Sequence, residues 1–187
     1  MMCFHRVSVV ACVTGAIALP VAAAHAQGDR TANLFRESYA LESARDYPGA
    51  LARVREARAG GSAPYFAMMR IGWLSYLHGD FAASIASYSE AIAAEPNAIE
   101  PKIGLTLPLL AQQNWRELER ACNAVLASDP RNATGLARLG IAQYNSGNHG
   151  GAEATYRRLT GDYPSDLDYK TGLGWALLRQ GKLAEAR

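Results

Sequence analysis

Residues 65–98 read YFAMMRIGWLSYLHGDFAASIASYSEAIAAEPNA, and they show most clearly the structural unit from which the chain is built. From Tyr65 to His78 the apolar residues recur at helical spacing, which predicts a first helix, helix A. Gly79-Asp80 is then a turn, in which glycine adopts a left-handed conformation and aspartate caps the next helix. The apolar stripe from Phe81 to Ala94 predicts a second helix, helix B, and Pro96 ends the unit because proline cannot continue a helix.

The same helix–turn–helix unit recurs with a period of 34 residues. The units are 31–64, 65–98, 99–132, 133–166 and a partial unit at 167–187. When the positions of each unit are numbered from one, position eight holds small residues in every unit: Ser38, Gly72, Thr106, Gly140 and Gly174. A fixed period of this length indicates a stacked array, in which each unit buries its apolar face against its neighbours.

Small residues also recur at position twenty, where Ala50, Ser84, Ala152 and Ala186 stand. Because positions eight and twenty face each other across the helix pair, small side chains there let the two backbones approach closely. Position twenty-four fills the gap to the next unit with Val54, Tyr88, Cys122 and Tyr156. We therefore expect Cys122 to be a buried packing residue and not a reactive thiol.

The chain closely resembles the tetratricopeptide repeat family over essentially all of the residues after position 26. The residues that carry the resemblance include Gly72, Ser84, Ala91, Pro96, Gly140, Ala152 and Pro164. The resemblance implies an all-α fold, a right-handed superhelical solenoid of antiparallel helix pairs with the A helices along its concave wall. The chain departs from the family pattern in two units. In the first, Glu37 stands where an apolar residue is expected and Gly60-Gly61-Ser62 replaces the proline stop. In the third, Leu118 replaces a small residue and Pro108 is expected to kink helix A.

The resemblance also implies where a partner would bind, because the family builds its groove from fixed positions of helix A. Those positions give the candidate partner-binding residues Phe35, Tyr39, Met69, Trp73, Tyr76, Tyr144, Trp175 and Arg179. Aromatic side chains of this kind supply rigid contact area in interfaces and suit an extended or helical peptide segment. The alternative is that some of them pack between repeats. A clamp for a C-terminal carboxylate is rejected, since Phe35, Tyr39 and Trp73 replace its polar residues.

Residues 1–26 have the form of a secretory signal peptide, which would leave 27–187 as the repeat array. Arg6 precedes an apolar run from Val7 to Ala24, and Ala24-His25-Ala26 provides small residues at a cleavage site. We therefore expect a periplasmic or secreted protein.

Two alternatives to cleavage remain. A retained membrane anchor is disfavoured because the run is short for a spanning helix and contains Gly15 and Pro20. Lipid attachment at Cys12 is disfavoured because few apolar residues precede that cysteine.

The charge balance argues against a nucleic-acid partner. The formal net charge is +2, and loss of residues 1–26 removes Arg6 and no acidic residue, which leaves +1. Both signs are interspersed, whereas nucleic-acid binding needs a basic face. Cys3 and Cys12 also leave with the signal, and a single remaining Cys122 cannot form an internal disulfide.

Catalytic chemistry has few candidates in the sequence. The histidines of the mature chain, His78 and His149, lie at turns of different repeats without the spacing of a metal site. Gly172 and Gly174 lie within a helix and read as a packing pair, because a phosphate loop would need a third glycine. We expect no catalytic residue, no metal and no cofactor.

The sequence stops at Arg187, inside the fifth unit. Helix B of that unit is at most about one turn long, too short to be stable alone, so helix A with Leu173, Leu177 and Leu178 lacks its cover. The chain is either a fragment of a longer array or docks on another chain through this end, and we predict self-association through it.

Taken together, these features predict a non-catalytic protein–protein interaction scaffold or adaptor in the cell envelope. The alternative is a repeat subunit, or the N-terminal fragment, of an envelope machine for polysaccharide export or outer-membrane assembly. After signal removal no membrane span is expected, and the identity of the partner protein or peptide is not encoded in any motif.

Overall fold

The computed structural model describes residues 18–61 and 63–186, and every regular element within them is an α-helix. Residues 1–17 of the predicted signal peptide lie outside the described residues, and residues 18–26 belong to the first helix. Cleavage after Ala26 stays a prediction. Along the chain the helices are α1 (Ala18–Ser43), α2 (Tyr47–Ala59), α3 (Pro64–His78), α4 (Phe81–Ala94), α5 (Glu100–Ala111), α6 (Trp115–Ser128), α7 (Ala133–Asn145), α8 (His149–Asp162) and α9 (Leu167–Arg179).

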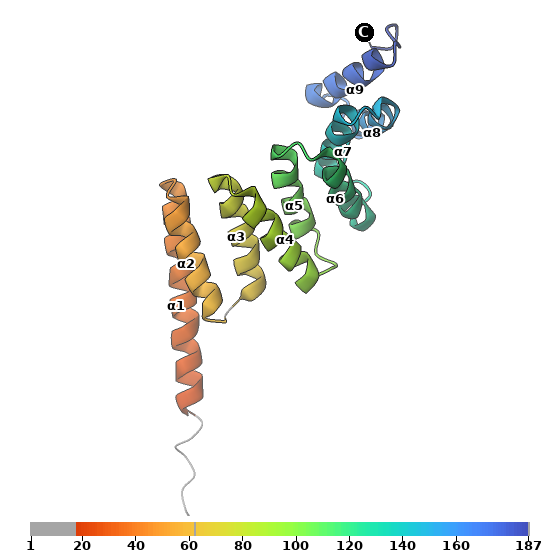
Figure 1. The fold of residues 1–187 in the computed structure, drawn as a ribbon. Helices are drawn as coiled ribbons and strands as arrows, with labels where there is room; N and C mark the ends of the chain where they lie inside the picture. Colours follow the sequence, from red (N-terminus) through yellow and green to blue (C-terminus); the bar gives the residue numbers. More distant parts are fainter. Residues whose placement is uncertain (1–17, 62, 187) are drawn as a thin grey trace, which may run out of the picture.

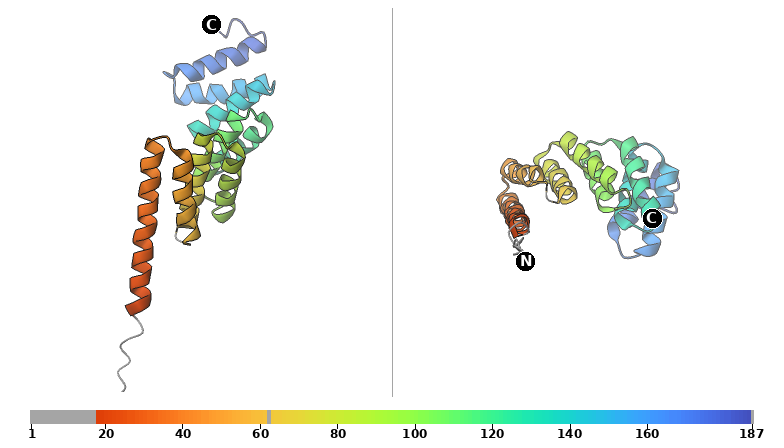
Figure 2. Two further views of the ribbon diagram at one scale, coloured as in Figure 1. Left: turned by 60° about the vertical axis from the view of Figure 1, so that its left-hand side comes forward. Right: turned by 90° about the horizontal axis from the view of Figure 1, so that it is seen from below.

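Successive helices pack as antiparallel pairs, and the pairs stack into a solenoid (Figure 1). The odd-numbered helices are the predicted A helices and the even-numbered ones the B helices. Seen from below, the pairs follow an arc, and the pairs near the C-terminus are turned relative to those near the N-terminus (Figure 2). The predicted all-α architecture is confirmed.

The turn between helices A and B has one design throughout the array. At its first position the backbone φ is positive, +85° at Gly79 and again at Gly147. The next residue then caps helix B, as the Asp80 carboxylate does by accepting a hydrogen bond of 3.0 Å from the backbone N–H of Ala83. The prediction made for Gly79-Asp80 is confirmed, and the equivalent caps are Asp46, Asn114 and Asn148.

The predicted close approach of the paired helices is also confirmed. The hydroxyl of Ser84 on α4 donates a hydrogen bond of 2.7 Å to the carbonyl oxygen of Gly72 on α3. The ring of Tyr88 lies on Gly72 and reaches Gly104 of the next unit, so both glycines make room for it. Tyr156 occupies the same place between Gly140 and Gly172, which shows Gly172 as a packing residue.

In the fifth unit, residues 182–186 form turns after α9 and no helix. Pro108 lies inside α5 and is buried there. Within the described ranges, no helix has both the length and the apolar character needed to cross a membrane.

Candidate partner-binding surface

The A helices form the inner side of the arc. Helix α3 contacts α5, α5 contacts α7 and α7 contacts α9, whereas among the described residues no two B helices are packed comparably. Because the A helices of neighbouring units pack together and, among the described residues, the B helices do not, the array curves toward the A helices, as the view from below shows (Figure 2). All of the candidate partner-binding residues lie on A helices.

The structure removes Phe35 from the candidate surface. Its side chain is only 9% exposed and belongs to the core formed by α1, α2 and α3. The Phe66 ring meets it edge-on, with the ring centroids 4.8 Å apart. The resemblance placed this position in the groove, but the apolar side chain packs into the first helix pair instead.

Tyr39 and Trp73 belong to a polar cluster between α1 and α3. Arg70 is 6% exposed, and its Nη1 lies 2.5 Å from Oε2 of Glu42 while Nη2 donates to the Ser38 hydroxyl at 2.9 Å. The indole N–H of Trp73 donates to Oε1 of Glu42 at 2.7 Å, and the Arg70 guanidinium lies 3.9 Å from the centre of the Tyr39 ring. These contacts hold both aromatic rings in place before any partner arrives.

Two effects compete on the pKa of Glu42. Burial raises it, but hydrogen bonds from Trp73 and Arg70 and the charge of Arg70 outweigh burial and leave the pKa below its ordinary value. Glu42 is therefore a carboxylate at neutral pH, as the pairing with Arg70 requires.

Half-buried aromatic side chains continue the surface along α3. The rings of Trp73 and Tyr76 are 5.8 Å apart, and Tyr76 lies 6.1 Å from Phe81 at the start of α4. Met69 is half-buried on the same helix. Such rings expose one part to solvent while packing anchors the rest, which suits a binding surface that forms without rearrangement.

A second aromatic group joins α7 and α9. Nε of Arg179 donates a hydrogen bond of 3.1 Å to the hydroxyl of Tyr144, and the Tyr144 ring lies 5.3 Å from His149. Trp175, one turn before Arg179, is 53% exposed. The structure thus splits the predicted set into two groups, one on α1 and α3 and one on α7 and α9.

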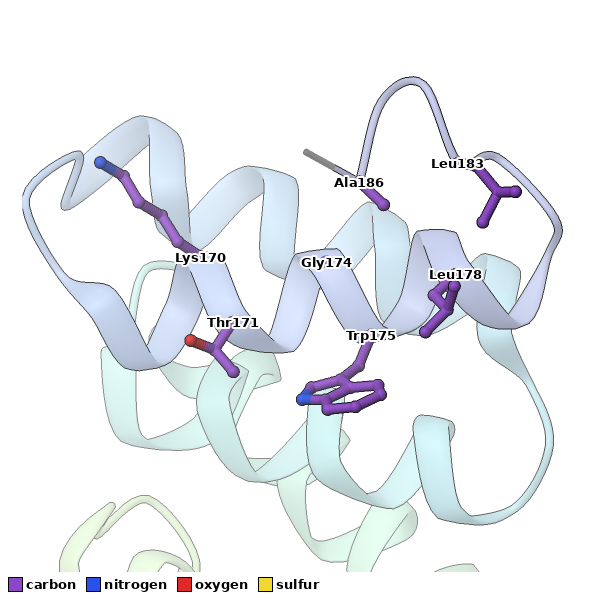
Figure 3. A pocket seen from close by; sticks show the side chains of 7 residues that line it. All are labelled: Lys170, Thr171, Gly174, Trp175, Leu178, Leu183 and Ala186. Carbon is purple, nitrogen blue, oxygen red and sulfur yellow. The ribbon is translucent and has the colours of Figure 1, made fainter.

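The open face of α9 carries a pocket of about 610 Å³ (Figure 3). Leu183 and Ala186, from the segment after α9, lie above the helix, and Lys170 lies toward its N-terminal end. The residues that line the pocket are Lys170, Thr171, Gly174, Trp175, Leu178, Leu183 and Ala186. Its lining is mostly apolar, with Lys170 as the cation.

The described residues offer little for catalysis. No three His, Cys, Asp or Glu side chains gather in them as a metal site would require. Cys122 is fully buried, and burial raises the pKa of its thiol to about 12, so the thiolate is scarce at neutral pH. The prediction that Cys122 packs in the core is confirmed.

Sequence reasoning missed the arginines that organise the inner face. Arg70 and Arg138 both stand at position six of their units, and each reaches back to the preceding A helix. The recurrence of arginine at position six, in three of the five units (Arg36, Arg70 and Arg138), was the signal that could have identified them.

Comparisons with known proteins agree with this geometry. A family model described as tetratricopeptide repeat matches residues 35–99, 109–166 and 138–187. No curated protein matches the chain.

Several solved structures have a similar fold at low sequence identity. A tetratricopeptide repeat protein from Parabacteroides merdae is 16% identical with a TM-score of 0.78, over 84% of this chain. This chain spans 63% of the length of that protein. A MamA protein from Desulfovibrio magneticus is 17% identical with a TM-score of 0.79, over 86% of this chain and 90% of that one. A thermophilic repeat protein from Thermus thermophilus is 16% identical with a TM-score of 0.61, over 83% of this chain and 86% of that one.

Proposed function

The chain belongs to the tetratricopeptide repeat family, and on that premise we propose that it is a protein-binding scaffold of the cell envelope. In this proposal a segment of a partner protein lies along the inner, A-helix side of the array. Proteins of this family generally act as non-catalytic scaffolds, and the comparisons indicate no enzyme family.

The observation that carries the proposal is the set of anchored yet accessible aromatic rings on the A helices. Tyr39 is 46% exposed and Trp175 is 53% exposed, while Trp73, Tyr76 and Tyr144 are half-buried. The rings other than Trp175 are already held by neighbouring side chains, so they lose little entropy on binding, and aromatic residues often dominate interface energies.

Affinity capture from an envelope extract tests the scaffold. The full chain is compared with the double variant Trp175→Ala/Tyr144→Ala and with Tyr163→Ala as a control, since Tyr163 is 44% exposed but lies beyond the end of a B helix. We expect a protein that the wild type and the control retain and the folded double variant loses. Retention of the same proteins by all three would refute this surface.

The envelope location rests on residues 1–26, and it has its own test. Cell fractionation followed by mass determination should find a chain that begins at Gln27 outside the cytoplasm. An uncleaved chain in the cytoplasmic fraction would contradict the location without affecting the binding surface.

A further inference from the structure

Two arginines hold equivalent places in the array, two units apart. Arg70 on α3 and Arg138 on α7 both stand at position six of their units. Each donates to the hydroxyl at position eight of the preceding unit, Arg70 to Ser38 and Arg138 to Thr106. Nη1 of Arg138 also donates to the carbonyl oxygen of Ile103 at 2.9 Å.

The two arginines differ in their counter-ion. Glu42, at position twelve of the unit before Arg70, accepts from Arg70 at 2.5 Å and from the Trp73 indole at 2.7 Å. Position twelve of the unit before Arg138 is Leu110, and the residue equivalent to Trp73 is Ile141. Arg138 has no acidic partner in the described part of the chain, and its Nη2 and Nε make no hydrogen bond there.

The surroundings of Arg138 favour an added negative charge. Burial lowers the pKa of its guanidinium, yet arginine stays protonated, so a charge is held in a partly desolvated place with only neutral acceptors. Arg70 is buried beneath its carboxylate partner, whereas Arg138 is half-buried and can still be reached from solvent. A buried charge gains most from a partner of opposite sign with good geometry.

We propose that Arg138 anchors an aspartate or glutamate side chain of the bound partner segment, which would supply the counter-ion that Glu42 gives to Arg70. Leu110 and Ile141 stand at the positions equivalent to Glu42 and Trp73, so the array itself supplies no acidic side chain and no indole N–H there. The proposal rests on the proposed function, because it assumes that a protein segment lies along the A helices, and it adds the chemistry of that segment.

The first test observes Arg138 directly. The Nε–Hε signals of the arginines are followed by NMR in the full chain, at constant ionic strength. The probes are the tripeptide Ala-Glu-Ala capped at both ends, its Gln counterpart, and uncapped Ala-Ala-Ala, which offers only a C-terminal carboxylate. We expect the Glu peptide to shift the Arg138 signal and to leave that of Arg70 unchanged.

The three peptides distinguish a glutamate side chain from a C-terminal carboxylate as the ligand of Arg138. An unmoved Arg138 signal, or equal shifts with the Glu and Gln peptides, overturns the proposal. A larger shift with uncapped Ala-Ala-Ala than with the Glu peptide also overturns it, since the site would then read a chain end.

The second test supplies the carboxylate within the chain. Leu110→Glu places a glutamate at the position that Glu42 has in the first unit, so it should abolish the response of Arg138 to the Glu peptide. Leu178→Glu is the matched control at the same position of another unit, and it should leave that response intact.

Arg138→Gln keeps the test valid if Leu110→Glu does not fold. Wild-type protein should broaden the side-chain methylene signals of the Glu peptide, and the folded Arg138→Gln variant should not. Equal broadening by both proteins would reject the site. If partner capture depends on Trp175 and Tyr144 but the Arg138 signal does not respond to the Glu peptide, the scaffold proposal is supported and the carboxylate site is rejected. If the Arg138 signal responds but capture does not depend on the two aromatic residues, the carboxylate site is supported and the aromatic surface is rejected.

Discussion

Tyr88 shows how one side chain joins three helices. It projects from α4, is 3% exposed, and lies between Gly72 of α3 and Gly104 of α5. A Cβ at Gly104 would lie 2.3 Å from Cε1 of this ring, and one at Gly72 would lie 2.9 Å from its Cζ. The ring cannot move away from one glycine without approaching the other, so both positions require a residue without a side chain.

Gly104→Ala should consequently lower the free energy of unfolding by about 1–3 kcal/mol, the usual cost of overpacking a core. Gly161→Ala, in α8, is the matched control because no atom lies within 4 Å of its Cβ position. Alanine favours a helix over glycine, so the control should gain up to about 1 kcal/mol. Urea titrations of the three proteins measure both effects, and equal changes in the two variants would contradict the packing argument.

Glu42 makes a contribution to the free energy of unfolding that depends on pH. Its pKa in the folded chain is lowered from the ordinary value of 4.5. A lowered folded pKa means that the stabilisation is present above pH 4.5 and is lost as the pH falls through the folded value. Glu42→Gln should thus have a lower free energy of unfolding than the wild type at pH 7, and this difference should become smaller in acid.

Urea unfolding at pH 7 and pH 3 tests this sign. Glu37→Gln serves as the control, because Glu37 is exposed and its contact with Arg53 is 3.7 Å long; its gap from the wild type should be small at both pH values. A gap for Glu42→Gln that is the same at both pH values would show that the carboxylate is not the source of the stability.

Among the elements, the helix-capping turns were the most predictable feature. The glycine before Asp80 and the apolar stripe after it predicted both helix ends, and α3 and α4 end and begin there. Arg45 and Gln113 adopt the same positive φ without being glycine, 61° and 55°. Local patterns predicted the turns because each is built within a few neighbouring residues.

Asp80→Ala should remove the cap of α4 and lower the free energy of unfolding by about 1 kcal/mol. Asp80→Asn retains an oxygen that accepts from the N–H of Ala83 and should cost much less. Chemical denaturation compares the two. If both variants were equally destabilised, the charge of Asp80 and not its hydrogen bond would hold the helix end.

Contacts between units were less predictable than the elements themselves. Phe35 was assigned to the groove from its position in the unit, yet its ring is buried against Phe66. The pairing of Arg70 with Glu42 crosses from one unit to the next and depends on two side chains that the repeat pattern does not constrain. A period predicts which backbones meet, but the side chains at each junction decide what remains exposed.

At the scale of the whole molecule, the order and pairing of the helices followed from the period alone. What it did not predict is that accessible aromatic rings fall into two groups, around Tyr39 on α1 and around Trp175 on α9. A partner segment that contacts both groups must span the array, so its fit would depend on the curvature that the contacts between A helices produce. Variants at the two ends should then weaken binding of one partner together.

The exposed apolar surface of α9 is the basis of the last prediction, self-association. Leu178 is 42% exposed and Leu183 is 58% exposed beside the pocket of about 610 Å³. Adjacent exposed apolar side chains of this size favour association with another surface. We expect sedimentation velocity to show an average mass that rises with protein concentration.

Substitution separates this association from partner binding. Leu178→Ser/Leu183→Ser leaves Trp175 in place and should shift the chain toward the monomer, whereas Tyr39→Ser removes an exposed aromatic ring at the other end of the array and should not. A monomer mass for the wild type at every concentration would contradict the predicted self-association. If Tyr39→Ser alone abolished association, the contact would lie on the first helix pair, and the face of α9 would be left for a different partner.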